Sequence, residues 1–116
     1  MLLAGVTSLL IVLAAVLVAL VQEPAAPPPA DDADPSALGR RVYDERGCRL
    51  CHAIAGTGNT RYPLDGVGSR LTTEEIRKWI VAPTEMDPQV RKPAFTDIPP
   101  HELDALVAYL RSLPEG

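Results

Sequence analysis

Aromatic residues are scarce in this 116-residue sequence, where only 4% of the side chains belong to Phe, Trp or Tyr. A chain of this length has room for one ordinary domain, and so few large side chains supply little apolar mass for a core. Small domains of this kind often depend on a disulfide, a metal or another staple. The shortage is therefore a first indication that a cofactor completes the core.

Basic residues are absent from the first third of the chain, since no lysine or arginine precedes Arg40. Four of the fifteen acidic residues lie within residues 23–34, so the chain after them, with eleven acidic and eleven basic residues, is formally neutral. A nucleic-acid-binding protein would show a basic excess, which is missing here. Because no lysine or arginine precedes Arg40, the positive-inside rule gives no orientation for a membrane segment in this part of the chain.

Charge is missing altogether from residues 2–21, where Thr7 and Ser8 are the only polar side chains. A helix of that length spans about 30 Å, which matches the hydrocarbon core of a bilayer. We therefore predict a transmembrane anchor over residues 1–21. A cleaved signal peptide is the alternative, but the apolar run is longer than a usual h-region and no basic residue precedes it.

The segment after the anchor, residues 22–35, contains five of the twelve prolines and no large apolar side chain. This composition cannot form a core and favours extended conformations that reach about 40 Å over such a length. It predicts a solvated linker between the anchor and a globular part over residues 36–116.

No stretch of the globular part alternates convincingly as a strand, so we expect a small all-α domain. Ser36 is the expected N-cap of a first helix over residues 37–46, which Gly47 ends. A second helix is expected from Thr72, whose hydroxyl forms a capping box with Glu75, to about residue 81.

A third helix follows Pro99 and Pro100 and ends before Pro114. It is predicted by an apolar stripe at helical spacing, which consists of Leu103, Leu106, Val107, Leu110 and Leu113.

Both cysteines of the chain lie in one short motif, Cys48-Arg-Leu-Cys51-His52. This C-x-x-C-H pattern is typical of covalent haem attachment. Two thiols three residues apart on a helical turn project to the same side. Both can form thioethers with one haem, and the following imidazole can then bind the iron as proximal ligand.

Other readings of the motif are weaker. A structural zinc site needs four ligands, and only His101 remains as a further histidine. A thioredoxin-like redox pair expects an α/β context, which the sequence does not show. A simple disulfide leaves His52 unexplained.

Residues 36–114 resemble a class I c-type cytochrome. This resemblance covers nearly all of the globular part. Gly39 and Tyr43 resemble the glycine and the aromatic residue of that family's N-terminal helix. Leu106 and Tyr109 resemble residues of the C-terminal helix that crosses it. The small Gly39 would let the two helices approach closely.

The resemblance also implies haem-binding residues outside the motif. Residues 62–70 resemble the loop whose proline carbonyl accepts the proximal imidazole N–H, a role that Pro63 would take. Arg70, at the end of this loop, would be a further cofactor-binding residue. Trp79 resembles the tryptophan that packs near a haem propionate.

The distal iron ligand is where the sequence departs from the family pattern. The family commonly has Met-Pro shortly before the last helix, and this register reads Lys92-Pro93-Ala94-Phe95 here. Met86 is the only methionine after Met1, and we predict it as the sixth ligand. A deprotonated Lys92 and an open or water-bound iron remain as alternatives.

These features predict a membrane-bound cytochrome with one covalent haem c, which transfers single electrons in a respiratory or photosynthetic chain. A tethered carrier would take electrons from a quinol–cytochrome c oxidoreductase and deliver them to a terminal oxidase or a photosynthetic reaction centre. A fixed subunit of such a complex is a second reading. A haem-based sensor or small-ligand-binding domain is a third, and it needs an open distal site.

The resemblance implies haem attachment outside the bacterial cytoplasm, and therefore a domain on the periplasmic or outer face of the cytoplasmic membrane. No Ser–His–acid set or carboxylate pair stands out, so we do not expect an enzyme that performs bond chemistry itself.

Four arginines lie near the motif: Arg40, Arg41, Arg46 and Arg49. They are either a solvated helix face or a docking patch for an acidic partner.

Overall fold

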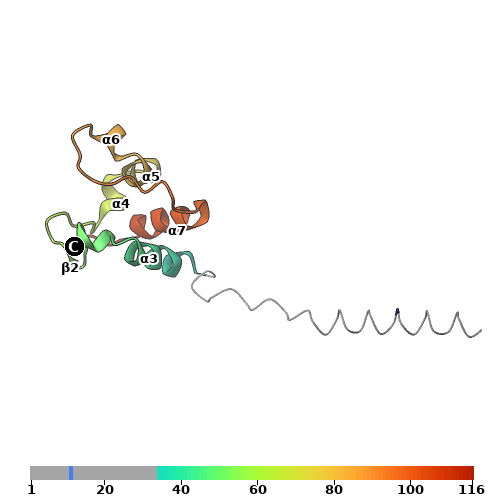
Figure 1. The fold of residues 1–116 in the computed structure, drawn as a ribbon. Helices are drawn as coiled ribbons and strands as arrows, with labels where there is room; N and C mark the ends of the chain where they lie inside the picture. Colours follow the sequence, from blue (N-terminus) through green and yellow to red (C-terminus); the bar gives the residue numbers. More distant parts are fainter. Residues whose placement is uncertain (1–10, 12–33) are drawn as a thin grey trace, which may run out of the picture.

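The computed structural model describes residue 11 and residues 34–116 of the chain (Figure 1). The described part contains five helices, a 3-10 turn and a minimal hairpin. Their bounds in chain order are α3 (Pro35–Glu45), η1 (Cys48–Leu50), β1 (Ala53–Ile54), β2 (Thr57–Gly58), α4 (Val67–Arg70), α5 (Thr73–Val81), α6 (Pro83–Met86) and α7 (Pro100–Arg111).

Helix α3 begins two residues earlier than the sequence pattern indicated. Asp34 is its N-cap, and the Asp34 Oδ1 accepts a hydrogen bond from the backbone N–H of Ser36 at 2.9 Å. Ser36 was therefore wrong as the predicted cap. Pro35 suits the first helical position, because its missing N–H would have no partner there. The C-terminal prediction is confirmed, since Gly47 follows the helix with φ of 68°.

Helix α5 has the predicted capping box. The backbone N–H of Glu75 donates to the Thr72 hydroxyl at 3.2 Å, and the Glu75 carboxylate accepts from the backbone N–H of Thr72 at 2.8 Å. The helix ends at Val81, and Pro83 then opens the single-turn helix α6.

Helices α3 and α7 cross against each other and carry most of the core (Figure 1). The crossing is close at Gly39, which packs on the backbone of Ala105 and on Tyr109. Helix α5 covers one side of α7 and contributes Ile76 and Ile80. The buried apolar residues of this core are Leu38, Val42, Tyr43, Val67, Ile76, Ile80, Ile98, Ala105, Leu106, Val107 and Leu110.

Three short elements escaped the sequence analysis. Helices α4 and α6 have four residues each, and the hairpin pairs Ala53 with Gly58 and Ile54 with Thr57 in antiparallel register. Such lengths cover about one helical turn or one alternation of a strand, so no periodic signal can emerge. The all-α expectation holds for the rest of the described domain.

Within the described residues, no helix has the length and apolar character needed to cross a membrane. The anchor predicted for residues 1–21 falls outside this part of the chain, apart from residue 11. Most of the predicted linker also falls outside it.

Candidate functional site

The two cysteines and the histidine share one tight turn directly after α3. The left-handed Gly47 reverses the chain, and the backbone N–H groups of Cys51 and His52 both donate to the carbonyl of Cys48, at 3.1 and 3.0 Å. Cys48 is half-buried against the core, whereas Cys51 is exposed. The structure thus brings together the three residues that the motif predicted.

The imidazole of His52 is oriented by a backbone carbonyl. Its Nδ1 lies 3.0 Å from the carbonyl oxygen of Tyr62. A protonated Nδ1 that donates to this carbonyl leaves the lone pair of Nε2 available for a metal. Burial lowers the pKa of His52, although the hydrogen bond to Tyr62 acts in the opposite direction. The neutral imidazole, which is the form that binds iron, is therefore favoured.

The acceptor for His52 corrects the role expected for Pro63. The N–H of Leu64 donates to the Ala53 carbonyl at 2.8 Å, and Ala53 forms a parallel bridge with Pro63. In a trans peptide the C=O points opposite to the N–H, so the Pro63 carbonyl faces away from this side. In an extended chain successive carbonyls point to opposite sides, so the preceding carbonyl, that of Tyr62, points toward His52.

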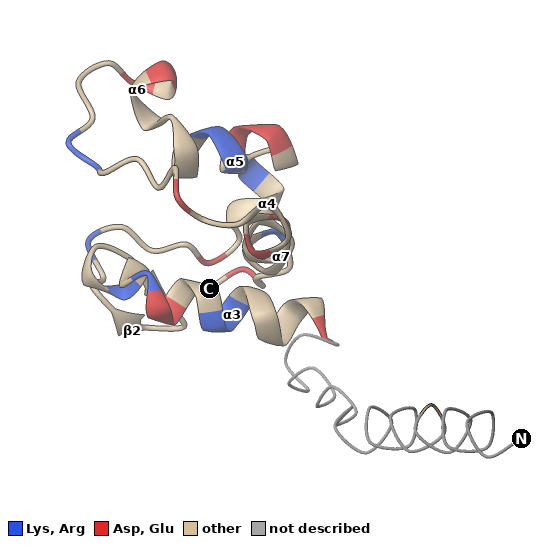
Figure 2. Ribbon diagram, turned by 45° about the vertical axis from the view of Figure 1, so that its right-hand side comes forward, with Lys and Arg blue, Asp and Glu red and all other residues tan. Residues whose placement is uncertain are grey.

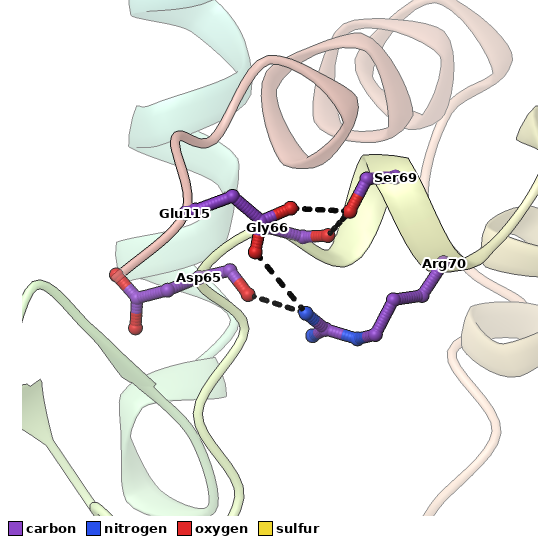
Figure 3. Close-up of polar contacts among 5 residues, drawn as sticks. All are labelled: Asp65, Gly66, Ser69, Arg70 and Glu115. Atoms are coloured by element: carbon purple, nitrogen blue, oxygen red, sulfur yellow. Dashed lines mark hydrogen bonds and ion pairs between the residues drawn. The ribbon is translucent and has the colours of Figure 1, made fainter.

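The loop that presents Tyr62 is braced by the C-terminal tail, as Figure 3 shows. Arg70 Nη1 donates to the Asp65 carbonyl at 2.9 Å and lies 4.0 Å from the Glu115 carboxylate. Ser69 donates its hydroxyl to the carbonyl of Gly66 at 2.8 Å and also contacts Glu115. The structure therefore uses Arg70 to hold the loop, and a contact between Arg70 and haem stays a prediction.

Glu115 was missed by the sequence analysis. It follows the last proline of the chain, and its partners Ser69 and Arg70 lie more than forty residues earlier. No local pattern marks a long-range contact of this kind.

The aromatic residues that the resemblance singled out, Tyr43, Trp79 and Tyr109, lie on the three helices α3, α5 and α7. Tyr43 is buried, packs edge-on against Tyr109 with ring centroids 6.3 Å apart, and donates its hydroxyl to the His52 carbonyl over a long 3.4 Å. Burial raises the pKa of Tyr43 to about 12, so this hydroxyl remains a donor. Trp79 is half-buried on α5, and its position near a propionate stays a prediction.

The two candidates for distal ligand occupy different places. Met86 is the last residue of α6, which packs on α5. In both views α6 lies at the end of the domain away from α3 and β2 (Figures 1 and 2). Lys92 lies in the loop between α6 and α7, and its Nζ lies 5.3 Å from the centroid of the Phe95 ring.

This donor set fits a covalent haem. Two free thiols and a neutral imidazole with an available Nε2 are held on one turn. Leu50, within the same turn, leaves 77% of its surface exposed. A flat apolar group attached here would cover part of that surface.

Comparisons with known proteins agree with this geometry. The Cytochrome c family model matches residues 36–114. Cytochrome c oxidase subunit 2 of Alkalihalophilus pseudofirmus is 34% identical in an alignment 84 residues long, which covers 65% of this chain and 25% of that protein. The chain thus corresponds to about a quarter of this relative's length. No solved structure matches the chain. The chain belongs to the cytochrome c family, whose members transfer electrons through a covalently attached haem.

Proposed function

We propose that this protein is a membrane-tethered monohaem cytochrome that delivers single electrons to a terminal oxidase on the outer face of the bacterial cytoplasmic membrane. The observation that carries the proposal is the similarity to an oxidase subunit 2. The uncharged segment over residues 2–21 supports the tether, because its length suits a bilayer.

The chain's own residues prepare the site for this role. A bound haem supplies the iron that gains and loses one electron. His52 would hold that iron, and the carbonyl of Tyr62 keeps the His52 imidazole in one orientation. Cys48 would anchor the cofactor against the core, while the exposed Cys51 leaves its own side of the site near the surface.

The arginines near the motif are better explained as a solvated face than as a docking patch. Arg46 forms an ion pair with Asp97 at 2.7 Å, and Arg41 pairs with Glu45 at 3.4 Å. Their charges are thus partly compensated within the domain, which weakens any long-range attraction of an acidic partner.

A fixed subunit of an oxidase complex is the second candidate. It is favoured by the name of the relative, in which the matched region is part of a longer oxidase subunit. A free carrier and a fixed subunit share every residue of the haem site, so they differ only in what the protein assembles with.

The test is to separate native membranes from the soluble fraction, solubilise them gently, and stain a native gel for covalent haem. A stained band in the membrane fraction that migrates as a small species supports a tethered carrier. Stable co-migration with an oxidase supports a subunit. Covalent haem found entirely in the soluble fraction would contradict the tether.

Electron delivery is tested separately by mixing the reduced, solubilised protein with oxidase-containing membranes and following its absorbance. Oxidation that stops when a terminal-oxidase inhibitor is added is expected. A variant with both Cys48 and Cys51 changed to Ala serves as the control for haem attachment. Oxidation unaffected by the inhibitor would rule out the oxidase as acceptor.

A further inference from the structure

We propose that Asn59 is a positioning residue of the haem site, which holds the Tyr62 carbonyl against the His52 imidazole by bridging the attachment turn (residues 48–52) and the loop that follows β2. This inference rests on covalent haem at the attachment turn, which the proposed function also requires. It does not depend on the distal ligand or on the redox partner.

The backbone of Asn59 is bonded to the attachment turn. Its N–H donates to the carbonyls of Arg49 and His52, at 3.1 and 3.0 Å. The second of these bonds extends the hairpin of β1 and β2 by one residue, since Ala53 pairs with Gly58. The loop that begins at Asn59 therefore starts from a fixed place beside the residues that would hold the haem.

The side-chain amide of Asn59 links this turn to the loop itself. Its Nδ2 donates to the carbonyl of Leu50 at 3.2 Å, and its Oδ1 accepts from the backbone N–H of Arg61 at 3.1 Å. The second bond closes an Asx turn, in which an asparagine side chain binds the backbone two residues on. A reversed amide would place an oxygen against the Leu50 carbonyl and an N–H against the Arg61 N–H, so the two contacts define one orientation of Asn59.

The turn at Asn59 brings the chain back to the imidazole. The guanidinium of Arg61 lies 5.6 Å from the centroid of the Tyr62 ring, so these two neighbours are held together. The Tyr62 carbonyl then lies 3.0 Å from the His52 Nδ1. Beyond it, the backbone N–H of Leu64 donates to the carbonyl at the start of β1 at 2.8 Å. The loop that carries the acceptor is thus held by Asn59 at its start and by Leu64 at its end.

The hydrogen bond at Nδ1 affects how strongly His52 can bind iron. A carbonyl that accepts from Nδ1–H makes the opposite nitrogen, Nε2, more basic. A more basic ligand favours ferric iron, and such hydrogen bonds are one means by which a protein sets the reduction potential. Loss of the Asn59 side chain should therefore weaken the bond between His52 and Tyr62 and raise the potential.

The first test follows the His52 Nδ1 proton by nuclear magnetic resonance of the isotope-labelled, full-length ferrous holoprotein, kept under carbon monoxide so that the iron is low-spin. In Asn59→Ala this proton should exchange with water about two- to tenfold faster, the factor that one hydrogen bond of ordinary strength contributes. The reduction potential, measured without carbon monoxide, should rise. Unchanged exchange or an unchanged potential would overturn the inference.

A second variant separates the bridge from the Asx turn. In Asn59→Asp a carboxylate can still accept from the Arg61 N–H, but it cannot donate to Leu50. If the bridge positions the loop, the His52 proton should exchange as fast in Asn59→Asp as in Asn59→Ala, and exchange as slow as in the unmodified protein would contradict it. Thr60→Ala is the matched control, because Thr60 is the next exposed residue of the loop and its hydroxyl makes none of these contacts. It should change neither the exchange rate nor the potential.

A further readout needs no variant. In the unmodified holoprotein the backbone N–H of Arg61 should exchange slowly, although Arg61 is exposed, because Asn59 accepts its proton. Exchange as fast as in an unstructured peptide would show that the Asx turn is absent and the inference wrong. A chain without covalent haem would contradict the proposed function, whereas attached haem with an unchanged His52 proton in Asn59→Ala would contradict the role of Asn59 alone.

Discussion

At residue 39 the fold has no room for a side chain. A Cβ placed on Gly39 would lie 2.5 Å from the Tyr109 Cβ and 2.8 Å from the carbonyl carbon of Ala105. Both neighbours belong to the rigid helix α7, so they cannot move aside without separating the two helices. The close approach that the resemblance predicted for Gly39 is therefore confirmed.

Gly39→Ala should consequently destabilise the domain, by about 1–3 kcal/mol as for other overpacked sites. Urea unfolding of the holoprotein measures this free energy. Arg40→Ala, at the next and exposed position of the same helix, should change stability by no more than about 0.5 kcal/mol. A Gly39→Ala protein as stable as the unmodified one would mean that α3 and α7 do not cross as closely as described.

At the scale of single elements, helix α5 shows how local chemistry sets the ends of a helix. Its first turn is closed reciprocally by Thr72 and Glu75. The helix then places Ile76 and Ile80 in the core, and the Ile80 carbonyl receives the N–H of Phe95. The capping box thus stabilises the helix to which the loop of Lys92 is tied.

Thr72→Ala should cost about 1 kcal/mol of unfolding free energy, the usual value for a lost N-cap. Urea unfolding at neutral pH checks this value. Thr73→Ala is the control, because Thr73 lies one residue inside the helix and takes no part in the box. Equal effects of the two substitutions would show that the cap does not contribute.

Glu75 adds a pH dependence to the same element. The hydrogen bonds from the backbone and the side chain of Thr72 lower the pKa of Glu75 from 4.5. A carboxyl with a lowered folded-state pKa contributes stability above its unfolded value, and this stability is lost as the pH falls through the folded pKa. Between pH 7 and pH 3, Glu75→Gln should therefore lose less stability than the unmodified protein. A parallel decline of the two proteins would contradict this assignment.

At the scale of the whole domain, the haem is the expected link between the attachment turn and the α6–α7 loop. The loop is held at one end by Phe95 and at the other by the turn at Asp87, and Arg46 of the α3 C-terminus pairs with Asp97.

Removal of the cofactor should thus expose the loop to proteolysis. In a variant with both Cys48 and Cys51 changed to Ala, trypsin should cleave after the exposed Arg91 faster than in the holoprotein, by on the order of tenfold or more. Circular dichroism verifies that both proteins remain helical. Cleavage at the same rate in both would mean that the haem does not order this loop.

The helices that position the site, and the attachment motif itself, could be predicted from the sequence. Capping residues, terminal glycines and an apolar stripe act over a few residues, and so does the spacing of Cys48, Cys51 and His52. The helix ends, the buried face of the last helix and the shared turn of the motif therefore follow from local geometry. The expected N-cap was nevertheless wrong by two residues, because Asp34 and Ser36 are both good caps and only the path of the chain distinguishes them.

By itself, the sequence determined the family, the covalent attachment of haem and the main helices, since each depends on residues that are neighbours in the chain. Only the tertiary structure decided which carbonyl orients His52 and that Glu115 braces the loop of Tyr62. These contacts join segments about ten to more than forty residues apart. Their existence depends on how the chain returns on itself, which is set by the packing of α3, α5 and α7 rather than by any local pattern.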